Sequence, residues 1–465
     1  MSTGKEKRTG VLVSIAIASF INPFMISGLA VALPSMGEHF NISPGTLGIV
    51  ETSFLAATLI LLLPVGKYAD KFGLGRIYIS GMVLFILSSF LLGFASSFPM
   101  LISFRFFQGF ATAMLTSTGI AILTSEYPPE DRGRVIGIAV GAVYIGLSLG
   151  PFLGGFITQS LGWRYIFIFG ASFSIIALVL VLKNISFKKK ESNTRYNFKS
   201  AFLYILFISL IWIGFSKFQA GIVFIILLII GVIGFIIYLM LENTAADPII
   251  DVRLFKANKA FSLGNSLTLI NYASSIAVTF TFSLFLQYIK GFSPQQTGMI
   301  LVIQPIIQAI FAPVSGKLSD RYNPNVLVLG GMASCFTGLL IVLMINETSS
   351  MLFIYGLLIF FGLGFALFSS ANTNQVMSSV DKPYYGMASS MVGAMRTMGM
   401  LTSISIASGI FTHFIGDQKM TSALKDQFLK GVHVSFLIYL TISFIGLILS
   451  YRLLKLKPKS PYSNY

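Results

Sequence analysis

The sequence predicts an all-α integral membrane protein made of two related halves, on the strength of two observations. Hydrophobic residues make up 55% of its 465 residues, charged residues only 10%, and the mean hydropathy is +0.83, which is too apolar for a water-soluble globule. In addition, the stretch Gly66-Lys67-Tyr68-Ala69-Asp70-Lys71-Phe72 returns as Gly316-Lys317-Leu318-Ser319-Asp320-Arg321-Tyr322. Each copy follows the second hydrophobic stretch of its half, and such a repeat in an apolar chain is typical of transport proteins.

Fourteen hydrophobic stretches are long enough to cross the bilayer core, which takes about 20 helical residues. In order, they are predicted at about 11–32, 46–66, 77–96, 100–122, 134–158, 165–183, 199–216, 220–241, 261–289, 296–316, 326–345, 351–378, 386–411 and 432–454. The first stretch follows Lys5, Lys7 and Arg8, but it is too long for a signal peptide and lacks a cleavage pattern, so we predict a retained helix.

Two polar linkers divide the spans into groups. The first lies at 184–198 and the second begins at Glu242. We therefore predict an N-terminal six-helix bundle at 1–183, the linkers and two additional membrane helices at 184–259, and a C-terminal six-helix bundle with a tail at 260–465.

The distribution of basic residues predicts the orientation in the membrane. With the N-terminus inside, most of the 32 Lys and Arg residues fall on the inner side. The outer loops receive only Arg164, Lys217, Lys290, Lys419, Lys425 and Lys430. The positive-inside rule then places both termini in the cytoplasm and explains the formal charge of +16 without a nucleic-acid partner.

Several classes of chemistry find no support in the sequence. Cys335 is the single cysteine, so neither a disulfide framework nor a metal cluster is expected. Neither Gly66-Lys67 nor Gly316-Lys317 is set in a P-loop, so ATP is not the expected energy source, and no cofactor is expected. We expect a monomer whose partners are a small-molecule substrate, protons and membrane lipid.

Three further motifs accompany the repeated loop. They are Arg105-Phe106-Phe107-Gln108-Gly109, the series Gly137, Gly146, Gly150, Pro151, Gly154 and Gly155, and Leu161-Gly162-Trp163-Arg164-Tyr165-Ile166-Phe167. With these four motifs, which extend over most of the chain, the protein resembles the major facilitator superfamily, and within it the fourteen-span drug:proton antiporters related to tetracycline and quaternary-ammonium exporters. The resemblance implies the major-facilitator fold, with two six-helix bundles plus two additional central helices, and drug efflux across the cell membrane.

The repeated loop has a physical interpretation of its own. Gly66 and Gly73 are expected to allow a tight turn, and Asp70 is expected to cap the third span. Lys71 and Arg76 supply counter-charges. The resemblance implies a gate that latches the two halves together, with Gly316, Asp320 and Arg321 as the second copy; the alternative is a solvated loop that only sets topology.

Arg105 is predicted to face a cavity or a partner, because a guanidinium near the middle of a span costs roughly 2.5 to 3.5 kcal/mol. Gln108 and Thr112 follow it on the same helix face. The resemblance implies that Arg105 couples protonation to substrate binding, whereas a purely structural bridge between helices is the alternative. Arg396 is the other intramembrane base and matches an arginine that this group carries in its penultimate span.

One departure from the family pattern concerns acidic residues. Many members carry an Asp in the first span before a Val-Ala-Leu-Pro run, but here Phe24, Met25, Ile26 and Ser27 precede Val31-Ala32-Leu33-Pro34. Glu51 is the only acid placed inside a span, and it could instead be interfacial. The missing carboxylate weakens the case for proton coupling, with Glu51 as a candidate coupling residue, and a strongly cationic substrate is not favoured.

Polar and aromatic residues in the spans are the remaining candidates for cavity lining: Tyr144, Asn265, Asn271, Gln304, Gln308, Asn372 and Asn374. The alternative for each is a hydrogen bond between helices. The glycines around Pro151 are predicted to pack helices closely and to let the two halves move.

Together these features predict an exporter of amphipathic small molecules that works by alternating access in exchange for protons. A proton-independent uniporter or a dedicated metabolite or lipid exporter is the alternative within transport. A membrane-embedded lipid-modifying enzyme is disfavoured, because the spans lack paired acids and His39, His413 and His433 share no spacing.

Overall fold

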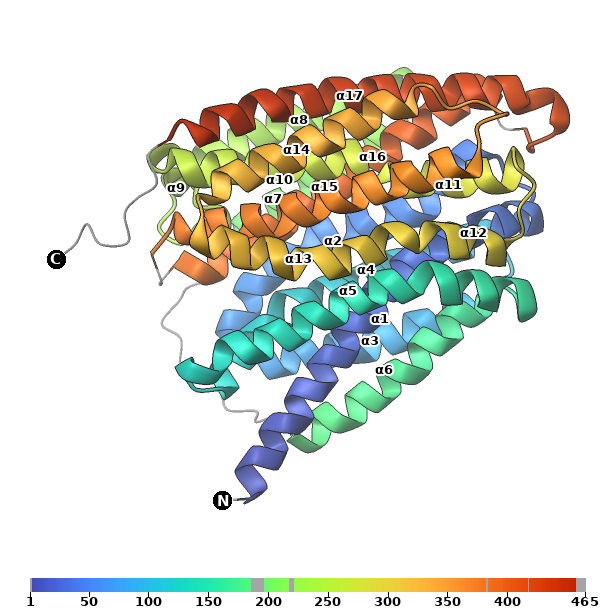
Figure 1. Cartoon of the computed structure of the whole chain (residues 1–465). Helices are drawn as coiled ribbons and strands as arrows, with labels where there is room; N and C mark the ends of the chain where they lie inside the picture. Colours follow the sequence, from blue (N-terminus) through green and yellow to red (C-terminus); the bar gives the residue numbers. More distant parts are fainter. Residues whose placement is uncertain (1, 185–195, 217–220, 382–383, 417, 457–465) are drawn as a thin grey trace.

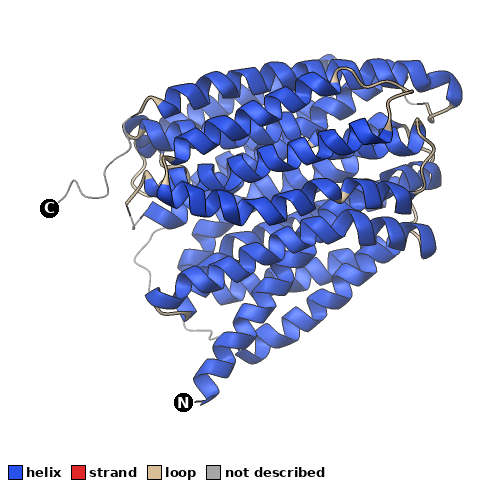
Figure 2. Cartoon of the chain, viewed as in Figure 1, coloured by secondary structure: helices blue, strands red, loops and turns tan. Residues whose placement is uncertain are grey.

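The computed structural model describes residues 2–184, 196–216, 221–381, 384–416 and 418–456, and these residues form helices joined by short loops (Figure 2). The long helices run side by side along one axis, and the first and last described residues lie at the same end of the molecule (Figure 1). We call this the terminal end and the opposite one the far end.

The described residues contain fourteen helical segments that are long and apolar enough to cross a membrane, so the predicted number of spans is confirmed. The N-terminal bundle consists of α1 (Ser2–Phe40), α2 (Pro44–Phe72), α3 (Leu74–Gly93), α4 (Phe98–Glu126), α5 (Pro129–Ser160) and α6 (Arg164–Asn184). Then come α7 (Phe198–Ser216), α8 (Ile222–Glu242) and the short α9 (Val252–Ala257).

The C-terminal bundle consists of α10 (Lys259–Ser275), α11 (Ala277–Tyr288), α12 (Pro294–Leu301), α13 (Ile303–Arg321), α14 (Pro324–Val342), α15 (Met351–Ser378), α16 (Tyr385–Ile415) and α17 (Lys425–Leu454), the last preceded by a 3-10 turn, η3 (Ser422–Leu424). Two of its spans are interrupted: α10 and α11 share the span Lys259–Tyr288, and α12 and α13 share Pro294–Ser319. This bundle therefore also has six spans.

Serine caps fix where several spans begin at the far end. Ser43 and Ser97 each accept a hydrogen bond from the backbone N–H three residues on, and each is followed within two residues by a proline. Ser293 forms a capping box with Gln296 at the start of α12. A serine cap followed by proline satisfies an otherwise unpaired N–H and pre-sets the first helical turn, which explains the short far-end loops.

The α7–α8 pair is central in the sequence but peripheral in the structure. The Tyr204 hydroxyl of α7 donates to the Leu59 carbonyl of α2, at 3.0 Å. At the end of α8 the buried Glu242 carboxylate accepts hydrogen bonds from the Ser200 hydroxyl of α7 and from the backbone N–H groups of Ile249 and Ile250. These bonds tie the pair to the edge of α2 and to the segment leading into α9.

The α5 glycine motif serves two contacts on different faces of one helix. Gly146, Gly150 and Gly154 lie against α1 within the N-terminal bundle, where a Cβ on Gly154 would stand 2.5 Å from the Gly28 Cα atom. Gly155 lies against the Pro294 backbone of α12, in the other bundle. Small residues permit such close backbone approach. Gly137, near the terminal end of α5, meets no atom within 4 Å of a built Cβ.

The repeated loop is mostly helix. The expected turn at Gly66 is absent, because α2 continues to Phe72. Gly73 alone makes the turn, with a φ of 111° that a side chain would disfavour. The expected capping of α3 by Asp70 is also wrong: Gly73 is the N-cap of α3, and no side chain caps it. In the second copy Asn323 caps α14 by accepting from the Asn325 N–H.

We expect Gly154→Ala to lower the free energy of unfolding by about 1–3 kcal/mol, because its Cβ would overlap the α1 backbone at Gly28. Gly137→Ala in the same helix is the matched control, since open space there should make it neutral or slightly stabilising. Thermal unfolding of the detergent-purified variants measures both. Equal melting temperatures for the two variants would contradict the packing described for α5.

Candidate functional site

The Arg105 side chain lies inside the N-terminal bundle, on α4. Its Nε donates to the Val50 carbonyl of α2 at 3.1 Å, and one terminal nitrogen donates to Gln108 Oε1 at 2.6 Å. The guanidinium also stands 4.3 Å from the centre of the Phe54 ring. Arg105 is 1% exposed, so the prediction that it turns away from lipid toward partners is confirmed by its surroundings.

Gln108 extends this network to a third helix. Its amide nitrogen donates to the Ser89 hydroxyl of α3 at 2.7 Å and approaches the Met25 sulfur of α1 at 3.9 Å. Gln108 and Ser89 are both buried. The polar stripe predicted on α4 thus connects all four helices of this part of the bundle.

Glu51 lies in the same region, one residue beyond the carbonyl that Arg105 holds. Its side chain is buried inside the bundle, and electrostatic attraction links it to Arg105. Among the described residues its Oε1 atom has no hydrogen-bond partner, and no ion pair within 4 Å joins the two side chains. Arg105 is therefore held by neutral groups, with the carboxyl of Glu51 nearby.

The hydrogen bonds that join the two bundles lie mainly toward the far end. Ser283 and Gln287 of α11 donate to the carbonyls of Ala30 and Val31 in α1. The Gln295 N–H of α12 donates to the Gln159 side chain of α5, and deeper in, the Ser148 hydroxyl donates to the Pro305 carbonyl. At the terminal end, built Cβ atoms on Gly137 and Gly316 meet nothing within 4 Å. The structure therefore holds the far end closed.

A second polar cluster lies between the bundles, near the middle of the spans. Tyr144 of α5 reaches the C-terminal bundle, where its hydroxyl lies beside the hydroxyls of Ser369 and Ser370 in α15 and near Arg396 of α16. The Arg396 guanidinium stands 5.4 Å from the centre of the Tyr272 ring of α10. We call Tyr144, Tyr272, Ser369, Ser370 and Arg396 the midspan cluster.

Three of the predicted cavity amides are structural. Asn372 of α15 donates to the Gly264 carbonyl and the Thr268 hydroxyl of α10, Asn265 donates within α10, and Asn271 donates to the sulfur atoms of Met332 and Cys335 in α14. All three amides are buried inside the C-terminal bundle. The structure thus favours the alternative stated from the sequence, hydrogen bonds between and within helices.

The other predicted amides lie on α13 and α15. Gln304 of α13 is buried and accepts a 3.5 Å hydrogen bond from Thr279. Gln308, one turn on, is half-buried and makes no hydrogen bond to the described residues. Asn374 of α15 donates to Ser319 of α13 at 2.9 Å. Gln304, Gln308 and Tyr144 remain predictions for contact with substrate.

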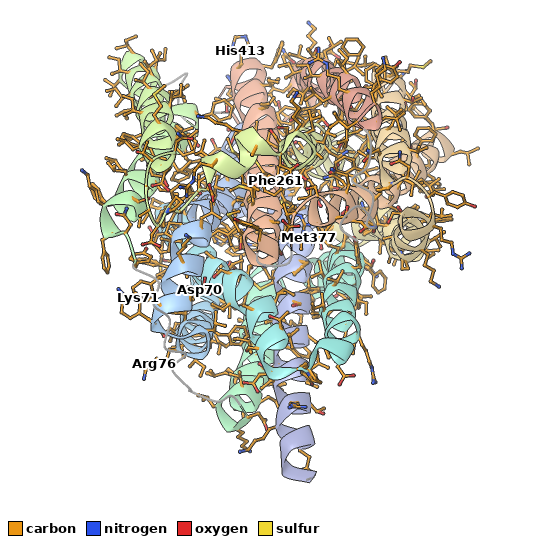
Figure 3. The ribbon with its side chains drawn as sticks, turned by 90° about the vertical axis from the view of Figure 1, so that its left-hand side faces the viewer. Asp70, Lys71, Arg76, Phe261, Met377 and His413 are labelled. Carbon is orange, nitrogen blue, oxygen red and sulfur yellow. The ribbon has the colours of Figure 1, made fainter. Side chains whose placement is uncertain are left out.

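The first copy of the repeated motif lies at the terminal end. Figure 3 looks onto this end and shows Asp70, Lys71 and Arg76 together at the edge of the N-terminal bundle. Asp70 and Arg76 are exposed, and Lys71 is half-buried with its ammonium 5.4 Å from the Phe72 ring. In the second copy Arg321 ends α13 and is exposed, whereas the side chain of Asp320 lies outside the described part of the structure.

Sequence reasoning missed the partners of both arginines. Ser89, Ser369, Ser370 and Tyr272 are ordinary residues of apolar helices, and nothing in their local sequence separates them from other serines and tyrosines in the spans. The Arg105–Gln108 pair was detectable, because a spacing of three residues places both on one helix face.

Two helical bundles that bury ionisable residues within membrane-spanning helices and meet across a shared polar cluster define a membrane transporter. The sequence model of the Major Facilitator Superfamily matches residues 15–242 and 264–464 of this chain. The chain belongs to this superfamily, and the family predicted from the motifs is confirmed.

The chain is similar to proteins that are named as transporters or resistance proteins. The chain is 28% identical to the riboflavin transporter RibZ of Clostridioides difficile, over 97% of this chain and 98% of that protein. It is 26% identical to the multidrug resistance protein Stp of Mycobacterium tuberculosis strain CDC 1551, over 88% and 77% of the two chains. It is 25% identical to the quinolone resistance protein NorB of Staphylococcus aureus, over 87% and 89%.

A solved structure shares the fold. The crystal structure of a bacterial homologue of the human lysosomal transporter Spinster, in an inward-facing and unoccupied conformation, superposes with a TM-score of 0.71. The match covers 98% of this chain and 99% of that one at 17% sequence identity.

We expect Gln108→Ala to destabilise the N-terminal bundle by about 1–3 kcal/mol, because it leaves a donor of Arg105 and the Ser89 hydroxyl without their buried partner. Gln308→Ala is the control, since the same change there removes no hydrogen bond to the described residues. Thermal unfolding in detergent is the measurement. A Gln108→Ala variant as stable as Gln308→Ala would show that the network does not hold the bundle together.

Proposed function

We propose that this transporter exports amphipathic small molecules from the cytoplasm in exchange for protons. The observation that carries the proposal is the midspan cluster, in which Tyr144 of one bundle meets Ser369, Ser370 and Arg396 of the other. A molecule bound there touches both bundles and is released when they rock apart, as alternating access requires. With both termini in the cytoplasm, the closed far end faces outward and the site loads from inside.

Proton coupling is assigned to Glu51 and Arg105. Glu51 on α2 supplies a buried carboxyl in place of the acid that the first span lacks. Arg105 is held by Val50 and Gln108 and stands close enough to interact electrostatically with this carboxyl. When Glu51 loses its proton, attraction draws the guanidinium toward it and away from the Val50 carbonyl. The network that links α2, α3 and α4 then changes with each proton.

A second candidate is a dedicated metabolite exporter that works without protons. The observation in its favour is the absence of an acid from the first span, where Phe24 to Ser27 precede Val31. The similarity to a riboflavin transporter over nearly the whole of both chains supports a single metabolite as substrate. The two candidates differ in whether transport moves protons.

We expect Glu51→Gln to abolish substrate-driven proton movement in liposomes, because the amide cannot release a proton. Purified protein is reconstituted with an internal pH-sensitive dye, and riboflavin or a quinolone is added outside or inside. Glu347→Gln is the control, since Glu347 forms a surface ion pair with Lys425 at the far end. Substrate uptake that moves no protons in the wild type would favour the second candidate.

The charged terminal-end motif is assigned to the gate that closes when the site faces outward. Asp70 and Arg76 are exposed and lie on the N-terminal bundle at the terminal end, the end where the other bundle approaches when the gate closes. An exposed ion pair formed in only one state shifts the balance between states by a small amount.

Asp70→Asn is therefore expected to slow transport by about two- to fivefold while leaving folding unchanged, the size that a surface ion pair allows. Asp381→Asn, which alters another exposed acid at the same end, should leave transport at its original rate. Initial rates in liposomes and melting temperatures give the two readouts. A rate equal to that of the wild type would remove Asp70 from the gate.

A further inference from the structure

Arg396 carries a positive charge between the bundles that no described residue neutralises. It lies near the middle of α16, well inside the span Gly386–Ile415. It forms no ion pair or hydrogen bond with the described residues, and its Nε atom is buried without a partner. A buried donor of this kind is normally paired, and a lone charge at membrane depth is more costly still.

The two intramembrane arginines differ in this respect. Arg105 is fully buried, donates to Val50 and Gln108, and has the carboxyl of Glu51 nearby. Arg396 has a partly exposed side chain that stands over the Tyr272 ring, with Tyr144 also near it. Its planar group therefore has free N–H donors along its edges, where they suit a carboxylate, sulfonate or phosphate.

The groups around Arg396 also favour a bound molecule of a particular shape. Tyr272 lies against the guanidinium on α10, and Tyr144 approaches from the opposite bundle. The hydroxyls of Ser369 and Ser370 lie beside that of Tyr144 on α15. Two aromatic rings, a cation and the hydroxyls of the cluster fit a flat aromatic molecule with an anionic group at its edge.

We infer that the midspan cluster binds aromatic anions and that Arg396 is its charge-selecting residue. This inference rests on the proposed function, because it names the substrate class of the same site. Arg396 pairs with the anionic group, Tyr272 and Tyr144 pack against the ring, and the serine hydroxyls bind polar atoms at its other edge. Aromatic cations are disfavoured, since they would approach a positive charge that lacks a nearby acid.

Binding of two xanthene dyes tests the inference. Fluorescein is an anion at neutral pH and rhodamine 123, which shares its ring system, is a cation. Fluorescence anisotropy with the full-length detergent-purified protein should show fluorescein binding at least about tenfold more tightly than rhodamine 123, since a hydrogen-bonded charge contributes that much or more. Arg396→Gln should remove the preference, and Arg396→Lys should retain part of it.

Melting temperatures separate loss of binding from loss of fold, and little change is expected because Arg396 holds no hydrogen bond to the described residues. Equal affinity for both dyes, no binding of fluorescein, or fluorescein binding that Arg396→Gln leaves unchanged would each overturn the inference.

The liposome assay keeps the two proposals apart. Anion-selective binding without any transport would overturn the proposed function and leave the inference standing. Proton-coupled transport of rhodamine 123 that Arg396→Gln leaves unchanged would support the proposed function and overturn the inference.

Discussion

A guanidinium cannot be left in contact with acyl chains, and this constraint shapes both bundles. In the N-terminal bundle it is met internally: Val50, Gln108 and Phe54 enclose Arg105, and the enclosure connects α2 to α4. In the C-terminal bundle Arg396 is kept away from acyl chains by its location, because it lies where the two bundles face one another. The enclosure of Arg105 ties the helices of its bundle together. The location of Arg396 leaves its charge available to a molecule that enters between the two bundles.

The α5 helix explains how such a pair of bundles can move against each other. Three of its glycines lie against α1 within the same bundle, whereas Gly155 and Pro151 lie against α12 of the other. Backbones in direct contact have no interdigitated side chains to disengage, so they can rock with little repacking. Toward the terminal end the same helix is packed less closely, since a built Cβ on Gly137 meets no atom within 4 Å. One helix thus makes a close backbone contact with each bundle, and we propose that its contact with α12 is the pivot.

The sequence predicted the parts of this structure that depend on composition and local spacing. Span number follows from hydrophobic length, and the Arg105–Gln108 contact follows from helix period. What it could not predict depends on tertiary placement: α7 and α8 lie at the edge of α2, and the buried Asn265, Asn271 and Asn372 serve helix packing. The error at Asp70 has a similar cause, since α2 extends through residues whose polarity marks a loop by composition alone.

Charge also decides which driving forces are available. Moving one elementary charge through the membrane potential is worth about 2.3 kcal/mol per 100 mV. An anion leaving the cell is driven by this potential even without protons, and exchange of that anion for an incoming proton is driven by about twice as much. A cation leaving in exchange for one proton gains nothing from the potential. A site built around Arg396 therefore fits a chain with few intramembrane acids, because an anionic substrate carries its own share of the driving force.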